Sequence, residues 1–296
     1  MILFYETMDK LFLIQCQASH IPLLQEFSLP YEHTCVELCS FLKKGPEHFF
    51  IFTLCENPTS SKHIQGFFHF NKTMHICIPF FESYKDTYKT LLKSFFTSDY
   101  FDYINLLVGE KTSADFVSSI LNDFSILPKH TNLYKVMTLT DEPALPPESL
   151  SADDEIKCCT KQNINELFNL QKYYLIKEVA LPNQKITDSE VNLMLSNILK
   201  NQLVLAVSSG LNDDEFVSKV NTNAIGSKWI QLGGIYTDPF NRRNYYAWHL
   251  IYTICKRIQK NHKNPCLFVK NNNTPALALY KKIGFKEQED FTILYF

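Results

Sequence analysis

A proline-rich and acidic stretch in the middle of the chain constrains its fold more than any other feature. Between Thr140 and Glu155, three prolines and six acidic residues interrupt the helical and strand periodicities of the flanking sequence. About 140 residues lie on either side of it, close to the usual length of one domain. We therefore expect two domains, residues 1–145 and 156–296, joined by a linker at residues 146–155.

Apolar periodicity predicts a mixture of helices and strands in both halves, and hence an α/β fold with mixed sheets. In the first half, helices are expected in the segments up to Leu42 and at residues 84–96 and 113–124, and strands at residues 48–54, 65–70, 74–80, 103–108 and 133–139. In the second half, helices are expected at residues 164–179, 188–200, 245–259 and 274–282. Strands are expected at residues 203–207, 215–220, 228–236 and 265–270. A further strand is expected to begin at Cys158 and Cys159, and a final pair of strands to run through Phe296. The shared order of elements leaves an ancient duplication open.

Composition excludes several classes of protein and partner. The 296 residues are 45% hydrophobic and 20% charged, which excludes a disordered chain, a collagen and a coiled coil. The net charge of −2 provides no field for nucleic acid or an anionic membrane, and no basic stripe occurs. Eleven basic and 16 acidic residues precede residue 145, whereas 18 basic and 15 acidic residues follow it, so the second half is the expected anion binder.

Location and metal binding can also be predicted from the sequence. No apolar run approaches the roughly 18 residues of a membrane span, and Glu6 and Asp9 stand where a signal peptide would be apolar. The nine cysteines are odd in number and form no C-x-x-C motif, which predicts a cytoplasmic protein without disulfides or structural zinc. His63, His69 and His75 lack acidic or cysteine neighbours and are expected to be surface side chains.

The segment from Leu232 to Leu250 carries the most chemical information. A strand runs through Gly233-Gly234 into Asp238-Pro239, a short polar loop and then an amphipathic helix. A helix N-terminus offers unpaired backbone N–H groups and the positive end of the helix dipole. This arrangement suits a phosphate or pyrophosphate.

Arginine is concentrated in that loop. The chain has three arginines among its 29 basic residues, and two of them, Arg242 and Arg243, are adjacent there. A guanidinium offers phosphate oxygens a planar fork that lysine lacks, which favours an anion site over a merely solvated pair at a helix start. Arg257 is expected on the outer face of the following helix.

The glycine pair predicts an irregular strand. Gly233-Gly234 would weaken a regular strand, so we expect a bulge that splays this strand from residues 265–270. Such an opening would leave backbone groups of Ile235 and Thr237 free to pair with a peptide-like ligand. Pantetheine, which has two amides, is such a ligand.

These residues resemble the acyl-coenzyme A core of the GNAT (acyl-CoA N-acyltransferase) superfamily, whose signature is [QR]-x-x-G-x-[GA] at a helix start. Arg242 and Ala247 match its first and last positions, whereas Tyr245 replaces its glycine. Phe268–Phe285 is similar to the second signature, in which an Asn-capped helix carries L-Y-x-x-x-G-F. The superfamily resemblance covers about residues 155–296.

A narrower resemblance is to predicted bacterial acetyltransferases that carry a GNAT-like N-terminal domain. It is carried by Phe216-Val-Ser, by Ile235-Tyr-Thr-Asp-Pro239 and by Leu107-Val-Gly-Glu-Lys111. It implies tandem GNAT-like domains: a degenerate one at residues 1–145, which lacks the phosphate-loop signature, and at residues 156–296 one with a splayed, bulged central sheet for coenzyme A.

The superfamily resemblance further implies an N-acetyltransferase in which a primary amine of a small molecule or amino acid attacks acetyl-CoA directly. No metal takes part, and a homodimer is possible. Tyr280 would be the acid that protonates the departing thiolate, with simple packing as the alternative. The implied coenzyme-binding residues are Ile235, Tyr236, Thr237, Arg242, Arg243, Asn244, Tyr245, Tyr246, Ala247, Asn273 and Ala276. Asn273 could equally serve only as a helix cap.

Two questions stay open at this level. The base that deprotonates the amine is not identifiable: Gln231 stands where such enzymes often carry a carboxylate, His249 is expected to be packed or exposed, and Glu178, Glu215 or ordered water remain alternatives. A positive φ at Tyr245 would strain the loop and reduce coenzyme affinity. The alternative function is therefore a non-catalytic acyl-CoA-binding or interaction module on the same fold.

Overall fold

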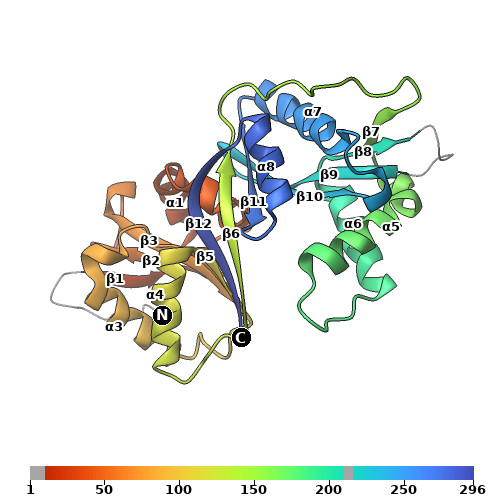
Figure 1. The fold of residues 1–296 in the computed structure, drawn as a ribbon. Helices are drawn as coiled ribbons and strands as arrows, with labels where there is room; N and C mark the ends of the chain where they lie inside the picture. The colour runs from red at the N-terminus through yellow and green to blue at the C-terminus, as the bar shows by residue number, and fades with distance from the viewer. Residues whose placement is uncertain (1–10, 210–215) are drawn as a thin grey trace.

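The computed structural model describes residues 11–209 and 216–296, and within these ranges all strands join one twelve-stranded mixed sheet (Figure 1). The first half contributes strands β1 (Phe12–Gln15), β2 (Phe49–Thr53), β3 (Ile64–Asn71), β4 (Thr73–Cys77), β5 (Leu106–Glu110) and β6 (His130–Thr138), and helices α1 (Ile21–Ser28), α2 (Val36–Phe41), α3 (Lys85–Phe96) and α4 (Lys111–Asn122). The second half contributes strands β7 (Glu155–Cys159), β8 (Val204–Ser208), β9 (Phe216–Ile225), β10 (Trp229–Thr237), β11 (Asn264–Lys270) and β12 (Lys286–Tyr295), and helices α5 (Ile164–Tyr174), α6 (Asp188–Asn201), α7 (Tyr246–Lys260) and α8 (Thr274–Ile283). The predicted α/β fold with a mixed sheet is confirmed.

The strand order relates the two halves to each other. It reads β1-β2-β3-β4-β5-β12-β6-β11-β10-β9-β8-β7, so in chain order each half starts at an outer edge of the sheet and proceeds towards its centre. The last strands are exchanged: β12 pairs with β5 of the first half, and β6 pairs with β11 of the second. Figure 1 shows β6 and β12 crossing the middle of the molecule side by side. Each half therefore completes its sheet with a strand of the other.

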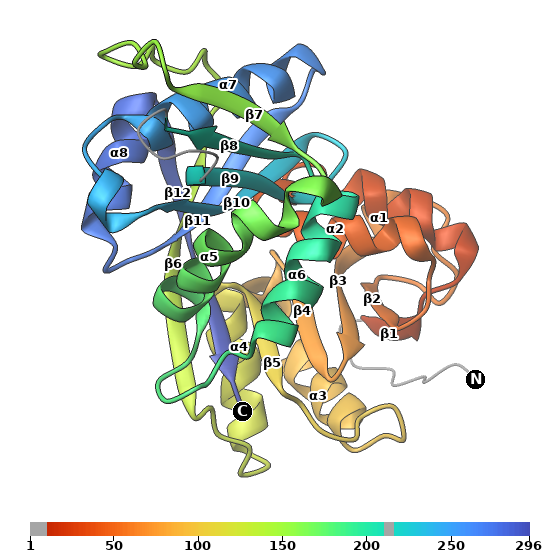
Figure 2. The ribbon, with the colours of Figure 1, turned by 90° about the vertical axis from the view of Figure 1, so that its right-hand side faces the viewer.

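Alternating side chains give the second half a core on each face of the sheet. On β8, Leu205 and Val207 pack under α7 and α8, whereas Val204 and Ala206 pack against α5 and α6. A strand is apolar on both faces when helices cover both faces of its sheet. Figure 2 shows α5 and α6 lying across the face opposite α7.

The first half uses the same principle with aromatic residues. On β2, Phe50 and Phe52 belong to a core beneath α3 and α4, while Phe49 and Ile51 face a second core beneath α1 and α2. Most of the phenylalanines of this half are thus committed to packing. Residues 139–154, which are all described and include the predicted linker except Glu155, form neither helix nor strand; Glu155 begins β7. The domain boundaries themselves stay a prediction.

Some predicted elements were wrong. The first segment of the described chain, Phe12–Gln15, is the edge strand β1 rather than a helix, because four residues are too few to distinguish the two periodicities. Cys158 and Cys159 end strand β7 instead of beginning one. The expected final pair of strands is the single long strand β12, whose polar run at residues 287–290 is an irregularity in its pairing with β6 and not a turn. Strand β9 is longer than predicted, and Glu215 lies outside the described residues.

Among the described residues, no helix has the length and apolar character needed to cross a membrane.

Candidate functional site

Strands β10 and β11 separate in the middle of the sheet. Among the described residues they pair in parallel only from Trp229 to Leu232, and β10 then bulges between Gly233 and Tyr236 in its pairing with β9. Gly234 has a φ of +59°, and a side chain there would overlap the amide oxygen of Asn221. The predicted bulged and splayed sheet is confirmed, and glycine is the residue that permits it.

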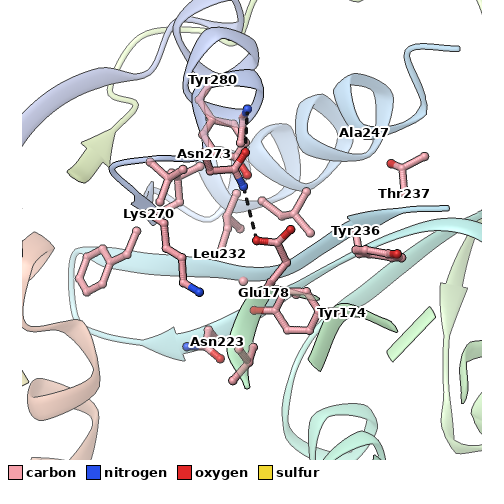
Figure 3. Close-up of a pocket in the computed structure, with 18 of the residues that line it drawn as sticks. Tyr174, Glu178, Asn223, Leu232, Tyr236, Thr237, Ala247, Lys270, Asn273 and Tyr280 are labelled. Carbon is pink, nitrogen blue, oxygen red and sulfur yellow. Dashed lines mark hydrogen bonds between the residues drawn. The ribbon is translucent and has the colours of Figure 1, made fainter. Parts of the chain in front are cut away.

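A cavity of about 1230 Å³ opens where the strands separate (Figure 3). Eleven of the residues predicted to bind the coenzyme or act on it line this cavity: Ile235, Tyr236, Thr237, Arg242, Arg243, Tyr245, Tyr246, Ala247, Asn273, Ala276 and Tyr280. Of the predicted set, all of which the structure describes, Asn244 alone is not part of this lining, and its side chain donates to the backbone oxygen of Asn241 at 3.4 Å. One cavity therefore contacts residues of β10, α7 and α8, whose individual roles stay predictions.

The turn between β10 and α7 presents two exposed cations to the cavity. Arg242 Nε donates to the Thr237 backbone oxygen at 3.2 Å, and its guanidinium lies 5.9 Å from the ring centre of Tyr236. Arg243 is also exposed. The first turn of α7, described in full, carries no acidic side chain. Positive charge at a helix N-terminus makes this end of the cavity suited to an anion.

Tyr245 adopts the strained conformation. Its φ is 56° and ψ is 9°, in the left-handed region, and Arg243 also has a positive φ of 68°. Such a conformation costs a residue with a side chain about 1–2 kcal/mol. The Tyr245 ring is 37% exposed and meets Trp248 of α7 with ring centres 6.5 Å apart. The side chain thus packs against α7 at the wall of the cavity, and the cavity stays open beside it.

Helix α8 brings Asn273 and Tyr280 to the opposite wall. Asn273 caps this helix by accepting from the Ala276 N–H at 3.3 Å, and its Nδ2 lies 3.5 Å from Glu178 Oε2 (Figure 3). Tyr280 is 7% exposed. Burial raises the pKa of its phenol, and Tyr174 and Glu178 raise it further. The phenol therefore carries its proton throughout the neutral pH range.

Sequence reasoning missed the buried side chain of Lys219, which lies beneath the bulge. Its Nζ donates to the Gly234 backbone oxygen at 2.8 Å and lies 4.9 Å from the ring centre of Tyr174. Burial lowers the pKa of Lys219 from its ordinary value of 10.5 to about 7. The available signal was a lysine inside the strand sequence Phe216-Val-Ser-Lys-Val220, in which apolar residues stand on both sides of it.

The far end of the cavity reaches the first half of the chain. Glu37 of α2 and Tyr134 of β6 line it together with Asn223, Lys270 and Tyr295 from the second half. Of the aromatic residues of the first half, Tyr134 alone belongs to this described lining. No local pattern links Glu37 to residues nearly 200 positions later, which is why the sequence did not reveal it.

The structure also shows the positions of other residues that the sequence analysis considered. His249 hydrogen-bonds the Glu148 backbone oxygen at 2.8 Å and so holds the segment after β6 against α7. Arg257 is exposed, as predicted. The surface placement of His75 was wrong: its side chain is 12% exposed, and burial lowers the pKa of His69 and of His75 to about 4. Among the described residues, no group of three His, Cys, Asp or Glu side chains is placed to hold a metal ion.

Comparisons with known proteins agree with this architecture. Residues 209–293 match the family model described as FR47-like protein. A Drosophila protein of 13% identity superposes with a TM-score of 0.67 over 97% of this chain and 99% of its own. A GNAT-family acetyltransferase from Colwellia psychrerythraea (12% identity, 97% and 99% coverage) and a tandem GNAT protein from the clavulanic acid biosynthesis pathway (8% identity, 96% and 97% coverage) both give 0.57. The search of curated proteins gives no match.

The fold and the splayed site define a tandem GNAT architecture. These comparisons show that the chain shares the fold of tandem GNAT proteins, and the FR47-like match lies within its second half. At identities this low, likeness establishes the fold alone, and the chemistry has to be argued from the site.

Proposed function

We propose that this protein is an N-acetyltransferase that transfers the acetyl group of acetyl-CoA to a primary amine of a small molecule or amino acid. The observation that carries the proposal is a single cavity that contacts the open edge of β10, the arginine turn and the buried phenol of Tyr280. The named activity of the Colwellia acetyltransferase, which shares the fold over nearly its whole length, supports the reaction class.

Each part of acetyl-CoA has a matching surface in this proposal. The pantetheine amides pair with the backbone of residues 235–237, where β10 has left β11. The pyrophosphate lies at the start of α7 and accepts from its backbone N–H groups and from Arg242 and Arg243. Asn273 and Ala276 line the pantetheine arm from the side of α8.

The reaction needs no covalent enzyme intermediate. The amine nitrogen attacks the thioester carbon, the new C–N bond forms and the C–S bond breaks. Tyr280 protonates the departing sulfur, and the amine loses a proton, so the products are an amide and a free thiol. Because burial raises the pKa of Tyr280, its phenol is protonated at neutral pH and has a proton to donate.

In the same proposal the first half is a partner domain without a coenzyme site. Its equivalent connection, residues 78–84 between β4 and α3, contains no arginine in this described stretch. All nine cysteines are free, which fits the proposed cytoplasmic location. A homodimer stays an expectation.

Two observations favour the second candidate, a non-catalytic acyl-CoA-binding module. Tyr245 holds a left-handed conformation where the superfamily signature has glycine, and Gln231 stands where a carboxylate would be the base. Incubation with acetyl-CoA and a panel of primary amines, followed by measurement of free thiol, separates the candidates. Amine-dependent thiol release supports the enzyme. Acetyl-CoA binding without thiol release, at any pH from about 6 to 9, supports the module and contradicts catalysis.

A further inference from the structure

The cavity continues into a small side chamber between the two halves. This chamber has a volume of about 120 Å³ and shares Glu37, Asn223, Gln231, Phe268 and Ile293 with the lining of the main cavity. One wall comes from α2 and β4 of the first half, and the other from β9, β10 and β11 of the second. The chamber is large enough for a small polar group, and no residue of the arginine turn, which is described in full, belongs to its lining.

Gln231 gives the chamber a hydrogen-bond acceptor that lacks a donor. This β10 side chain is 8% exposed, and its Oε1 has no hydrogen-bond partner among the described residues. A buried carbonyl oxygen without a donor is costly, and native structures rarely retain one without a reason. Because Gln231 lines both cavities, an N–H group of a bound molecule could satisfy it.

Glu37 faces the same chamber from the first turn of α2. Half of its side chain is accessible, and Glu37 lines both the main cavity and the chamber. Protein nevertheless surrounds the carboxylate, and this burial raises its pKa, while Lys44 opposes the increase. His75 Nδ1 of β4 lies 4.0 Å from Glu37 Oε2. Strands β9 and β10 pack against α2 and present the neutral amides of Asn223 and Gln231. Lys270 of β11 lines the main cavity.

A buried carboxylate fixes α2 in this position. Glu32, 1% exposed and just before α2, accepts from the backbone N–H groups of Ser227, of Lys228 at 2.7 Å and of Trp229 at 3.2 Å. Ser227 and Lys228 lie in the turn between β9 and β10, and Trp229 begins β10. Just after α2, Lys43 Nζ donates to the Ile225 backbone oxygen at 2.8 Å. Both ends of α2 are therefore tied to the strands that carry Asn223 and Gln231.

We propose that the first half supplies the base of the reaction: the acceptor amine binds between Glu37 and Gln231, and Glu37 is the catalytic residue that removes its proton. The inference rests on the proposed acetyltransfer. A small primary amine enters as its ammonium form, donates to Gln231 Oε1 and transfers one proton to the Glu37 carboxylate. The neutral nitrogen attacks the thioester carbon, the new C–N bond forms and the C–S bond breaks. Tyr280 protonates the departing sulfur and is reprotonated by the proton that the new amide nitrogen loses, while Glu37 returns the first proton to solvent. Glu37 thus takes the role that the amide of Gln231 cannot perform.

The experiment compares Glu37→Gln with the wild type, using the amine that the wild type acetylates fastest. The isosteric variant should lower kcat/KM by about 10²–10⁴-fold, while the Kd for acetyl-CoA stays within about twofold. Wild-type kcat/KM should fall on the acid side as Glu37 is protonated, and this acid limb should be absent in the variant. Glu289→Gln, which removes a carboxylate paired with His33 outside the cavity, is the matched control and should leave kcat/KM unchanged.

Two further variants keep the test decisive. Glu37→Asp retains a carboxylate, so it should recover part of the lost rate, and unchanged acetyl-CoA binding verifies that each variant is folded. Glu178→Gln tests the rival carboxylate of the cavity. A loss of the acid limb in Glu178→Gln but not in Glu37→Gln, or a Glu37→Gln rate within about threefold of wild type, overturns the assignment and leaves the acetyltransferase intact. Absence of wild-type turnover overturns both.

Discussion

The buried amine of Lys219 should make the stability of this protein depend on pH in a specific way. The side chain is 1% exposed, and its Nζ supports the bulge through the Gly234 backbone oxygen. In the unfolded chain Lys219 returns to its ordinary pKa of 10.5, whereas in the folded protein that pKa is about 7. Between these two values the unfolded state binds a proton that the folded state does not.

The sign and size of the effect follow from this difference. The free energy of unfolding should rise with pH between about 7 and 10.5, because protonation favours the unfolded state there; below about 7 both states are protonated and the dependence disappears. At about 1.4 kcal/mol for each pKa unit, lowering the pKa from 10.5 to about 7 costs about 5 kcal/mol when Lys219 is charged. Between about pH 7 and 9 the expected gain in stability is about 2 kcal/mol.

Replacing Lys219 with methionine isolates this contribution. Urea unfolding of wild type and Lys219→Met, followed by the fluorescence of Trp229 and Trp248 under reducing conditions, should be measured at about pH 6, 7, 8 and 9. The lost hydrogen bond to Gly234 shifts the variant by an amount independent of pH. The wild-type free energy of unfolding minus that of the variant should therefore be flat below about pH 7 and rise by about 2 kcal/mol by pH 9. A difference that stays constant across this range refutes the reasoning.

Three further substitutions test other parts of the account. Tyr245→Gly removes the cost of about 1–2 kcal/mol of a left-handed conformation, and it removes a side chain from the phosphate end of the cavity. Calorimetry should therefore find tighter acetyl-CoA binding. Weaker binding would mean that the ring itself contacts the nucleotide. Glu32→Ala leaves the backbone N–H groups of Ser227, Lys228 and Trp229 without their acceptor, so the free energy of unfolding should fall by about 2–3 kcal/mol. An unchanged urea midpoint would contradict this expectation. Tyr280→Phe should reduce kcat by about 10²-fold at unchanged acetyl-CoA affinity, and full activity would leave Tyr280 with a packing role.

The parts of the fold that depend on local chemistry were predictable from the sequence. The Gly233-Gly234 pair predicted the bulge because glycine weakens a regular strand. In the structure, Gly234 has a positive φ and approaches the side chain of Asn221 too closely for a side chain of its own. The glycine-rich strand, the arginine turn and the Asn-capped helix each have a signature within about 20 residues. The predicted residues of these segments consequently line one cavity, with Asn244 as the exception.

Features that depend on distant pairing were not predictable in this way. The exchange of β6 and β12 joins residues about 160 positions apart, and nothing in either strand sequence specifies which half it completes. Glu37 reaches the cavity because Glu32 fixes the β9–β10 turn almost 200 residues later. The sequence does not determine the left-handed φ of Tyr245, since the residue type alone argues against that conformation.

Calorimetric titration of acetyl-CoA into wild type and an Arg242→Ala, Arg243→Ala double variant tests the central claim, that the turn before α7 binds the coenzyme. The wild type should bind one acetyl-CoA per chain. Because a charge-assisted hydrogen bond contributes about 1.5–3 kcal/mol, loss of both guanidinium groups should weaken binding by about 10²-fold or more, with unfolding by urea unaffected. Equal affinity of the two proteins, or no binding to the wild type, would contradict the account.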